Sequence, residues 1–279
     1  MRLTTFSIVA IDLLCEKTIE EQIATIAFNG SCILVAVPNE MILWRVETFW
    51  DKEPDTLRWI ETFKPDDLFI DIGANIGLYS LYAALSRGVE TIAFEPESLN
   101  YALLNKNIFL NRLDRKMKAY SLALSNEMAL NAIHLSLFTA GAACHNFKEK
   151  FDFKHEPFVP QFSQGCFSMT LDSLIEQQLI PVPQYIKIDV DGMEHKILEG
   201  AKQTMKNAAV QSVLVELNMN LLSHRQVIEF MKENNFRCSR SQIQQSEGPF
   251  KEVVNYIFFR EPKSEWERCF SYASKISDL

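Results

Sequence analysis

Short apolar runs alternate with amphipathic stretches from residue 68 onward, and this alternation predicts the fold class. Apolar runs bounded by turn residues are typical of strands buried on both faces, whereas apolar residues at three- and four-residue spacing are typical of helices. The predicted strands cover residues 68–72, 91–94, 119–124, 185–190 and 213–217, and the predicted helices cover 78–85, 99–110, 171–178, 193–205 and 226–234. This order indicates an α/β protein with a parallel sheet covered by helices on both faces.

The first 64 residues have a different pattern and are predicted to form a small N-terminal cap. Residues 31–38 and 41–47 are apolar runs on either side of a turn signal, Pro38-Asn39-Glu40, and predict a hairpin. Apolar residues then recur at helical spacing over 55–63. The predicted organisation is a cap over 1–64, a main domain over 65–262 and a C-terminal tail over 263–279.

Two further segments complete the main domain. Residues 125–169 contain glycines, prolines and many phenylalanines without a clear period. A loop of this length is typical of a lid or a binding loop, and a strand-rich insertion with its own packing is an equal alternative. The apolar runs 236–239 and 254–259 follow each other directly and predict a terminal hairpin on a doubly wound sheet.

Composition narrows the partners and the compartment. The net charge is −8 and no long Lys/Arg run is present, so we expect no nucleic-acid partner. The six cysteines form no C-x-x-C pair, which argues against a zinc site and a disulfide scaffold. Asp12 interrupts the early apolar stretch, and no apolar run is long enough to span a membrane. We therefore expect a cytoplasmic protein, and composition leaves the oligomeric state open.

The sharpest chemical signal is the turn Asp71-Ile72-Gly73-Ala74-Asn75-Ile76-Gly77, which follows a strand and opens a helix. A nucleotide bound here approaches the backbone closely, which favours glycine at Gly73 and Gly77. Asn75 tolerates a left-handed backbone and keeps that geometry. The carboxylate of Asp71 is placed to accept a hydrogen bond from a cationic amine or a water. Any tight strand-to-helix turn has a similar pattern, so a second signal is needed.

Glu95 supplies that second signal at the end of the next strand, beside Pro96 and about twenty residues after the turn. An acid at this spacing accepts hydrogen bonds from the two ribose hydroxyls of an adenosine cofactor. The turn reads D-x-G-x-N-x-G rather than the dinucleotide pattern G-x-G-x-x-G, which favours S-adenosylmethionine. The predicted cofactor-binding residues are Asp71, Gly73, Asn75, Gly77, Glu95, Pro96 and Asp189.

Five segments, DLFIDIGANIGLYS, AFEPES, TLDSLI, YIKIDVDGMEHKILEGA and VLVELN, stand in this order between about residues 54 and 260. Together they resemble the FkbM family of methyltransferases. The resemblance implies a Rossmann-like seven-stranded methyltransferase sheet, S-adenosylmethionine as methyl donor, and mostly O-methylation of sugar or natural-product hydroxyls. Asp191 stands where that family usually has Glu. Residues 125–169 match poorly, and they are the segment expected to set the acceptor.

The reaction edge is predicted at the end of strand 185–190, because ligands of open α/β sheets lie beyond the carboxyl ends of the strands. Methyl transfer to oxygen needs an aligned hydroxyl and a group that takes its proton. Glu216 and Asn218, at the end of the next strand, are placed to line the same cleft. The predicted catalytic residues, in order of preference, are Asp189 and Glu194, then Asp191, then His195.

Two other interpretations of these acids stay open. Asp191 followed by Gly192 also fits the N-terminal cap of a helix. Three nearby acids could supply part of a metal site, but the segment turns helical too soon for a calcium loop, so no metal is predicted.

The sequence thus predicts an S-adenosylmethionine-dependent methyltransferase acting on a small-molecule or carbohydrate hydroxyl. The alternatives are an NAD-type oxidoreductase on a similar sheet and a non-catalytic nucleoside-binding module.

Overall fold

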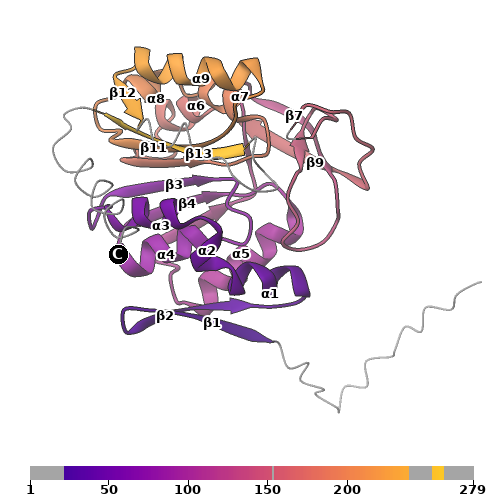
Figure 1. The fold of residues 1–279 in the computed structure, drawn as a ribbon, viewed down its shortest axis with the longest axis vertical. Coiled ribbons are helices and arrows are strands. Elements are labelled where there is room, and N and C mark those ends of the chain that lie inside the picture. Colours follow the sequence, from indigo (N-terminus) through magenta and orange to yellow (C-terminus); the bar gives the residue numbers. More distant parts are fainter. Residues whose placement is uncertain (1–21, 153, 239–252, 261–279) are drawn as a thin grey trace, which may run out of the picture.

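The computed structural model describes residues 22–152, 154–238 and 253–260, and its centre is a seven-stranded mixed sheet (Figure 1). In spatial order its strands are β12 (Phe236–Cys238), β13 (Val253–Arg260), β11 (Ser212–Asn218), β10 (Tyr185–Ile188), β3 (Leu68–Ile72), β4 (Glu90–Phe94) and β5 (Met117–Tyr120). The strands from β11 to β5 run parallel, and β13 pairs antiparallel with both β11 and β12. The predicted α/β sheet with a terminal hairpin is confirmed. Residue 239 and the predicted tail 263–279 lie outside the described residues.

Helices cover both faces of this sheet (Figure 1). One face carries α3 (Pro54–Glu61), α4 (Leu78–Arg87) and α5 (Ser98–Leu110), and the other carries α6 (Leu171–Glu176), α7 (Glu194–Glu199), α8 (Lys202–Lys206) and α9 (Leu222–Glu233). Side chains of β3 alternate between the two cores, because Phe69 packs on the first face and Ile70 on the second. None of the helices in the described part of the chain is long and apolar enough to cross a membrane.

The predicted helix 193–205 is two helices, α7 and α8, with Gly200 and Ala201 between them. Gly200 is the C-cap of α7. A Cβ at this position would overlap the backbone carbonyl of Ser125, so only glycine lets the chain pass this closely. The missing side chain of Gly200 therefore lets the start of the 125–169 segment pass close to the second helical layer.

The N-terminal region corrects one prediction. The hairpin is formed by β1 (Ile23–Phe28) and β2 (Ser31–Ala36), joined by Asn29 and Gly30, both with positive φ as a two-residue hairpin turn requires. The predicted strand over 41–47 is wrong, because these residues belong to helix α1 (Glu40–Glu47). The side chain of Asn39 accepts the N–H of Ile42 at 3.0 Å and caps this helix. The turn signal at Pro38-Asn39 therefore starts a helix and not a hairpin.

The cap is bonded directly to the main domain. Asn107 of α5 and the C-cap residue Asn111 accept hydrogen bonds from the backbone N–H groups of Ala36 and Leu34, at 3.0 and 2.9 Å. Asn107 also donates to the carbonyl of Ile76 at 3.0 Å, just before α4. This bonding brings α1 and the short helix α2 (Phe49–Lys52) beside the glycine turn that follows β3.

The 125–169 segment is strand-rich. It contributes β7 (Ala129–Leu135), β8 (Asn146–Phe147) and β9 (Phe162–Met169) to a four-stranded sheet with β6 (Ala123–Leu124), in the order β6-β9-β7-β8. The predicted strand 119–124 is thereby divided between two sheets, because its first half is β5 and its second half is β6. The strand-rich alternative is confirmed, and the lid role stays a prediction.

Candidate active site

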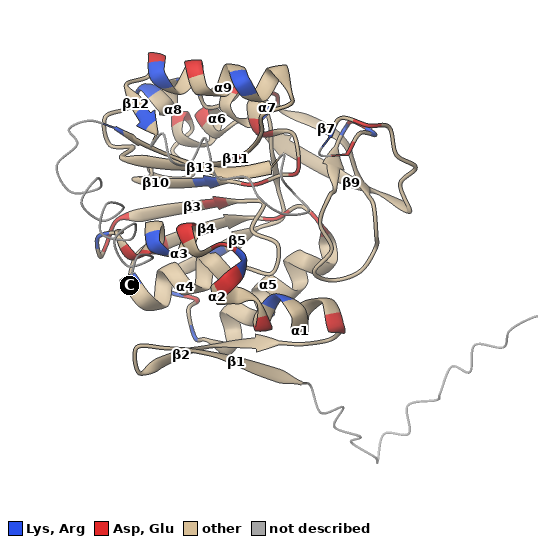
Figure 2. Ribbon diagram, in the orientation of Figure 1, with Lys and Arg blue, Asp and Glu red and all other residues tan. Residues whose placement is uncertain are grey.

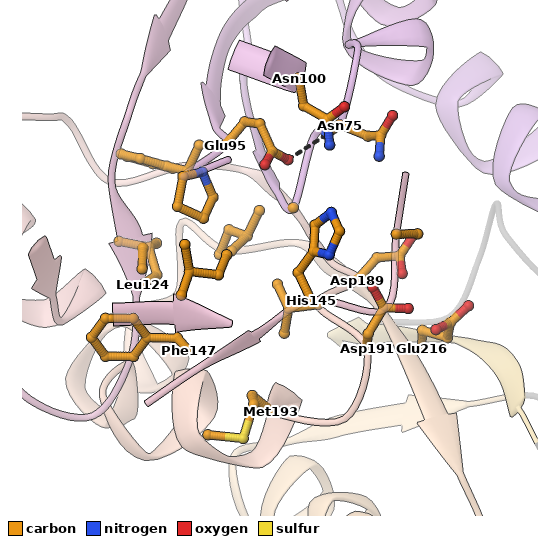
Figure 3. A pocket seen from close by; sticks show the side chains of 18 of the residues that line it. Asn75, Glu95, Asn100, Leu124, His145, Phe147, Asp189, Asp191, Met193 and Glu216 are labelled. Atoms are coloured by element: carbon orange, nitrogen blue, oxygen red, sulfur yellow. Dashed lines mark hydrogen bonds between the residues drawn. The ribbon is translucent and has the colours of Figure 1, made fainter. Parts of the chain in front are cut away.

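A cavity of about 170 Å³ lies at the carboxyl ends of β3, β4 and β10 (Figure 3). Figure 3 shows Leu124 and Phe147 on one side of it and the carboxyl groups of Asp189, Asp191 and Glu216 on the other. The cavity lies where ligands of open α/β sheets bind. The predicted residues that line it are Gly73, Asn75, Glu95, Pro96, Asp189, Asp191 and Glu216. Asn218, which was expected beside Glu216, does not line it.

Glu95 is fixed in this cavity by backbone donors. Its Oε2 accepts the N–H of Asn75 at 2.8 Å, and its Oε1 accepts the N–H of Glu97 at 2.9 Å. Burial raises the pKa of Glu95 to about 8, even though these two N–H bonds act in the opposite direction. The carboxyl group is therefore oriented before any ligand arrives.

The turn glycines are required for a reason that differs from the expected one. Gly73 and Gly77 both have left-handed backbones, with φ of 80° and 84°. A Cβ at Gly73 would overlap the carbonyl oxygen of Asp189, and a Cβ at Gly77 would overlap the side chain of Leu104. The protein's own packing on β10 and α5 thus demands glycine here. Gly77 does not belong to the lining of the cavity, although Gly73 does.

Asn75 and Asn100 hold residues 140–145, which lie between β7 and β8, against the cavity. Asn75 has the expected left-handed backbone, with φ of 50°, and its Nδ2 donates to the carbonyl of Ala142 at 2.8 Å. Asn100 donates to the same carbonyl at 3.1 Å and accepts the N–H of Gly141 at 2.6 Å. The amide of the predicted cofactor residue Asn75 therefore fixes one wall of the cavity.

Asp71 faces the first helical layer and not the cavity. It is 1% exposed, and its Oδ2 accepts the hydroxyl of Ser80 at 2.6 Å. Burial raises its pKa, with Lys187 acting in the opposite direction. Because Asp71 is absent from the lining of the cavity, the geometry does not support its predicted contact with an amine of the cofactor.

Asp189 is an ionised member of the acidic side of the cavity. Its Oδ2 accepts a hydrogen bond from Lys187, which is 2% exposed, at 2.6 Å. Burial by itself would raise the pKa of Asp189, but Lys187 and Lys52 outweigh it and lower that pKa. Glu216 shares a hydrogen bond with Asp189. Burial and the Asp189 charge raise the pKa of Glu216 well above its usual range, so Glu216 is the proton-bearing partner.

Asp191 differs from Asp189 in the balance of effects on its carboxyl group, because burial and the charge of Asp189 outweigh Lys52 and Arg45. It has a left-handed backbone, with φ of 58°, and its Oδ2 accepts the N–H of Cys144 at 2.6 Å. Burial and the neighbouring charge of Asp189 raise the pKa of Asp191 to about 6. The alternative that Asp191 caps a helix is wrong, because the N-cap of α7 is Met193.

Glu194 and His195 lie behind the cavity wall. Glu194 is 1% exposed, and its carboxyl group accepts the N–H groups of Val190 and Gly192 and lies 3.2 Å from His224. The His195 ring lies 5.8 Å from that of His224, and neither Glu194 nor His195 lines the cavity. The geometry therefore does not support a catalytic role for either residue.

The comparison with known families agrees with this geometry. Residues 71–238, more than half of the chain, match the methyltransferase FkbM domain. The chain belongs to the FkbM methyltransferase family. The resemblance predicted from the sequence is confirmed, and S-adenosylmethionine is the methyl donor of this FkbM methyltransferase.

Relatives of known name are distant. The hexuronic acid methyltransferase AglP of Haloferax volcanii is 22% identical over 190 residues, which cover 68% of this chain and 72% of AglP. The crystal structure of methyltransferase FkbM from Methylobacillus flagellatus has a TM-score of 0.46 at 13% identity, over 80% of this chain and 56% of that one. A precorrin-6y methyltransferase from Geobacter metallireducens has a TM-score of 0.43 at 12% identity, over 75% of this chain and 87% of that one.

The residues of the FkbM cavity fit the cofactor. The carboxyl group of Glu95 can accept ribose hydroxyls, and the apolar side chains of Phe94, Pro96 and Leu122 can pack against an adenine ring. Asp189, Arg45 and Lys52 provide both signs of charge elsewhere in the lining, as a zwitterionic methionine moiety requires. The bound cofactor would supply an electrophilic methyl group.

Three residues with basic side chains line the FkbM cavity and were not predicted, namely His145, Arg45 and Lys52. His145 is 9% exposed, its Nδ1 accepts the N–H of Ser136 at 3.4 Å, and its buried Nε2 has no hydrogen-bond partner among the described residues. Burial lowers the pKa of His145, which favours the neutral ring. Figure 3 shows this ring between Asn75 and Asp189. No local sequence pattern marks these three residues, because they come from the 125–169 segment and from the cap.

Proposed function

We propose that this FkbM methyltransferase methylates a hydroxyl oxygen of a sugar. The acidic side of the cavity supports this proposal, because Asp189 is ionised while Glu216 carries a proton. Sugar hydroxyls donate and accept hydrogen bonds, and this pair offers both kinds of partner. AglP, which is similar over most of the chain, is a hexuronic acid methyltransferase, and this supports a sugar acceptor as well.

Asp191 is the proposed general base, and its protonation behaviour carries the proposal. As the new C–O bond forms, the acceptor hydroxyl loses its proton, and a carboxylate with a pKa near the working pH takes it most effectively. The pKa of Asp191 is about 6, whereas Lys187 holds the pKa of Asp189 below its usual value. Asp189 therefore orients the hydroxyl, and Asp191 receives the proton.

A labelled-methyl assay tests the proposal directly. The enzyme is incubated with S-adenosylmethionine carrying a labelled methyl group and with hexuronic acids, neutral hexoses and amino sugars. We expect a mass increase of one methyl on a sugar oxygen. Labelling on nitrogen or carbon, or labelling of none of the sugars, would contradict a sugar hydroxyl as acceptor.

The same assay separates the remaining alternatives. A non-catalytic nucleoside-binding module would bind S-adenosylhomocysteine but transfer no label to any acceptor. The family match already sets aside the NAD-type oxidoreductase. We therefore expect saturable binding of S-adenosylhomocysteine together with methyl transfer that depends on Asp191.

A further inference from the structure

A second cavity of about 50 Å³, here called the side cavity, adjoins the main cavity at the glycine turn. It lies among α1, α2, the start of α4 and the end of β10. The two cavities have five lining residues in common, which are Arg45, Lys52, Gly73, Asn75 and Asp189. A ligand that fills the main cavity can therefore extend along this turn into the side cavity.

Two cations from the N-terminal cap line the side cavity. Arg45 of α1 donates through Nε and Nη2 to the carbonyl of Gly141, at 2.9 and 2.7 Å. Lys52 of α2 donates through Nζ to Glu53 at 3.0 Å. A guanidinium has five N–H groups and an ammonium has three, so both side chains keep further donors. Figure 2 shows basic residues on α1 and α2, the helices that carry Arg45 and Lys52.

The carboxylates of the side cavity already have protein partners. Glu53 accepts hydrogen bonds from Thr56 at 3.0 Å and from Asn255 at 2.9 Å, in addition to Lys52. Asp189 accepts one from Lys187. The principal partner of Arg45 is a neutral carbonyl, which does not cancel its charge. The side cavity is therefore suited to an anion that reaches Arg45 and Lys52.

We propose that Lys52 and Arg45 hold the carboxylate of the cofactor's methionine moiety in the side cavity. The adenosine end of the cofactor belongs with Glu95, on the other side of the glycine turn, and this carboxylate is the only anionic group of the cofactor. Both cations lie outside residues 71–238, which match the family. On this assignment the N-terminal cap completes the cofactor site. The assignment rests on the cofactor and is independent of which acceptor is methylated.

A carboxylate on the acceptor is the competing ligand for these cations. The residues lining the side cavity come from the cap, the glycine turn, α4 and β10, and none comes from the 125–169 segment. That segment is where acceptor recognition is expected. The side cavity therefore favours the cofactor over the acceptor.

Calorimetry with two cofactor fragments tests the assignment. S-adenosylhomocysteine carries the amino acid, whereas 5′-methylthioadenosine has the same adenosine and sulfur but lacks it. Lys52→Met keeps the aliphatic stem and removes the charge. We expect this variant to lose about tenfold in affinity for S-adenosylhomocysteine, the scale of one charged hydrogen bond, and to bind methylthioadenosine within about twofold of the wild type.

Lys148→Met is the matched control, because Lys148 is similarly exposed and ion-paired with Glu127 at 2.7 Å but lines neither of the two cavities. We expect it to bind both ligands as the wild type does. Arg45→Lys, which keeps a cation, should lose less affinity for S-adenosylhomocysteine than Arg45→Met.

Each possible result of this calorimetry has a different meaning. Equal losses for both ligands in Lys52→Met would mean that Lys52 supports the fold, and unchanged affinities would mean that it does not contact the cofactor. Either result overturns the assignment. Wild-type protein that binds neither ligand would overturn the cofactor site as a whole, a result distinct from failure of the sugar acceptor.

Discussion

Acidic residues at the ends of strands β4 and β10 line the same cavity, but different kinds of neighbour hold them and set their protonation state. At the end of β4, Glu95 is held by two backbone N–H groups, one from the glycine turn and one from its own loop. At the end of β10, Asp189 and Asp191 depend on Lys187, Glu216 and Cys144. A motif therefore places an acid reliably, whereas its protonation state depends on its tertiary neighbours.

The sharpest test of this contrast replaces Asp191, the proposed base, with the corresponding amide, asparagine. Asp191→Asn keeps the size and the acceptor for the Cys144 N–H but cannot take a proton. We expect turnover to fall by about 10²–10⁴ while the affinity for S-adenosylhomocysteine stays within about twofold. Single-turnover methyl transfer beside calorimetry measures both quantities. Retained turnover would give the base role to Asp189.

The pH dependence of the wild-type enzyme tests the same base. A base works only when it is unprotonated, and the pKa of Asp191 is about 6. The activity of the enzyme is therefore lost as the pH falls through about 6, and it reaches its full value above that pH. We expect kcat/KM for the acceptor, measured at saturating S-adenosylmethionine, to rise between pH 5 and about pH 7 and then to level. A profile that is flat over this range would contradict the assignment.

The next largest effect concerns the glycine turn that follows β3, the strand between β10 and β4. Gly73→Ala places a Cβ against the carbonyl of Asp189 on a left-handed backbone, so one of the two segments must move. We expect the free energy of unfolding to fall by about 2–3 kcal/mol, measured by urea denaturation. Gly165→Ala is the control, because its Cβ meets open space, and it should change stability by less than about 0.5 kcal/mol. Equal effects would contradict the packing explanation.

A somewhat smaller effect is expected at the β4 end. Glu95→Ala should weaken S-adenosylmethionine binding by about 1–3 kcal/mol, since ribose hydroxyls would lose their acceptor. Glu90→Ala, at the exposed start of the same strand, should leave affinity unchanged.

The affinity of the wild-type protein for S-adenosylmethionine should also depend on pH. Without a ligand the pKa of Glu95 is about 8, and ribose donors favour its ionised form. The affinity should therefore rise as the pH increases from 6 to about 8. Calorimetry at several pH values checks both, and unchanged affinity in Glu95→Ala would contradict the ribose role.

The smallest effect is expected behind the cavity wall. Glu194→Gln preserves an acceptor for the N–H groups of Val190 and Gly192 and lies outside the lining. We expect turnover within about threefold of the wild type. A loss comparable to that of Asp191→Asn would restore Glu194 as the base and would break the contrast between the two strand ends.

Local patterns predicted most of the framework. The run 68–72 is a strand over the same residues, and the strand-to-helix turn after it is present, because both depend on neighbours in the sequence. The error at 41–47 arose where one signal has two outcomes: Pro38-Asn39 can turn a hairpin or cap a helix, and the Asn39 side chain caps a helix here.

The sequence by itself determined the strand and helix order, the Gly73 turn, the position of Glu95 and the family, because each is written in residues close together along the chain. Tertiary structure alone decided which acids face the cavity. In the folded protein, Glu194 bonds to backbone N–H groups, and Asp189 pairs with buried Lys187. Arg45, Lys52 and His145 reach the cavity from distant segments of the chain. The physical reason is that burial and neighbouring charges determine the protonation state and the orientation of each acidic side chain. Those neighbours come together only when the sheet, the cap and the insertion pack against one another.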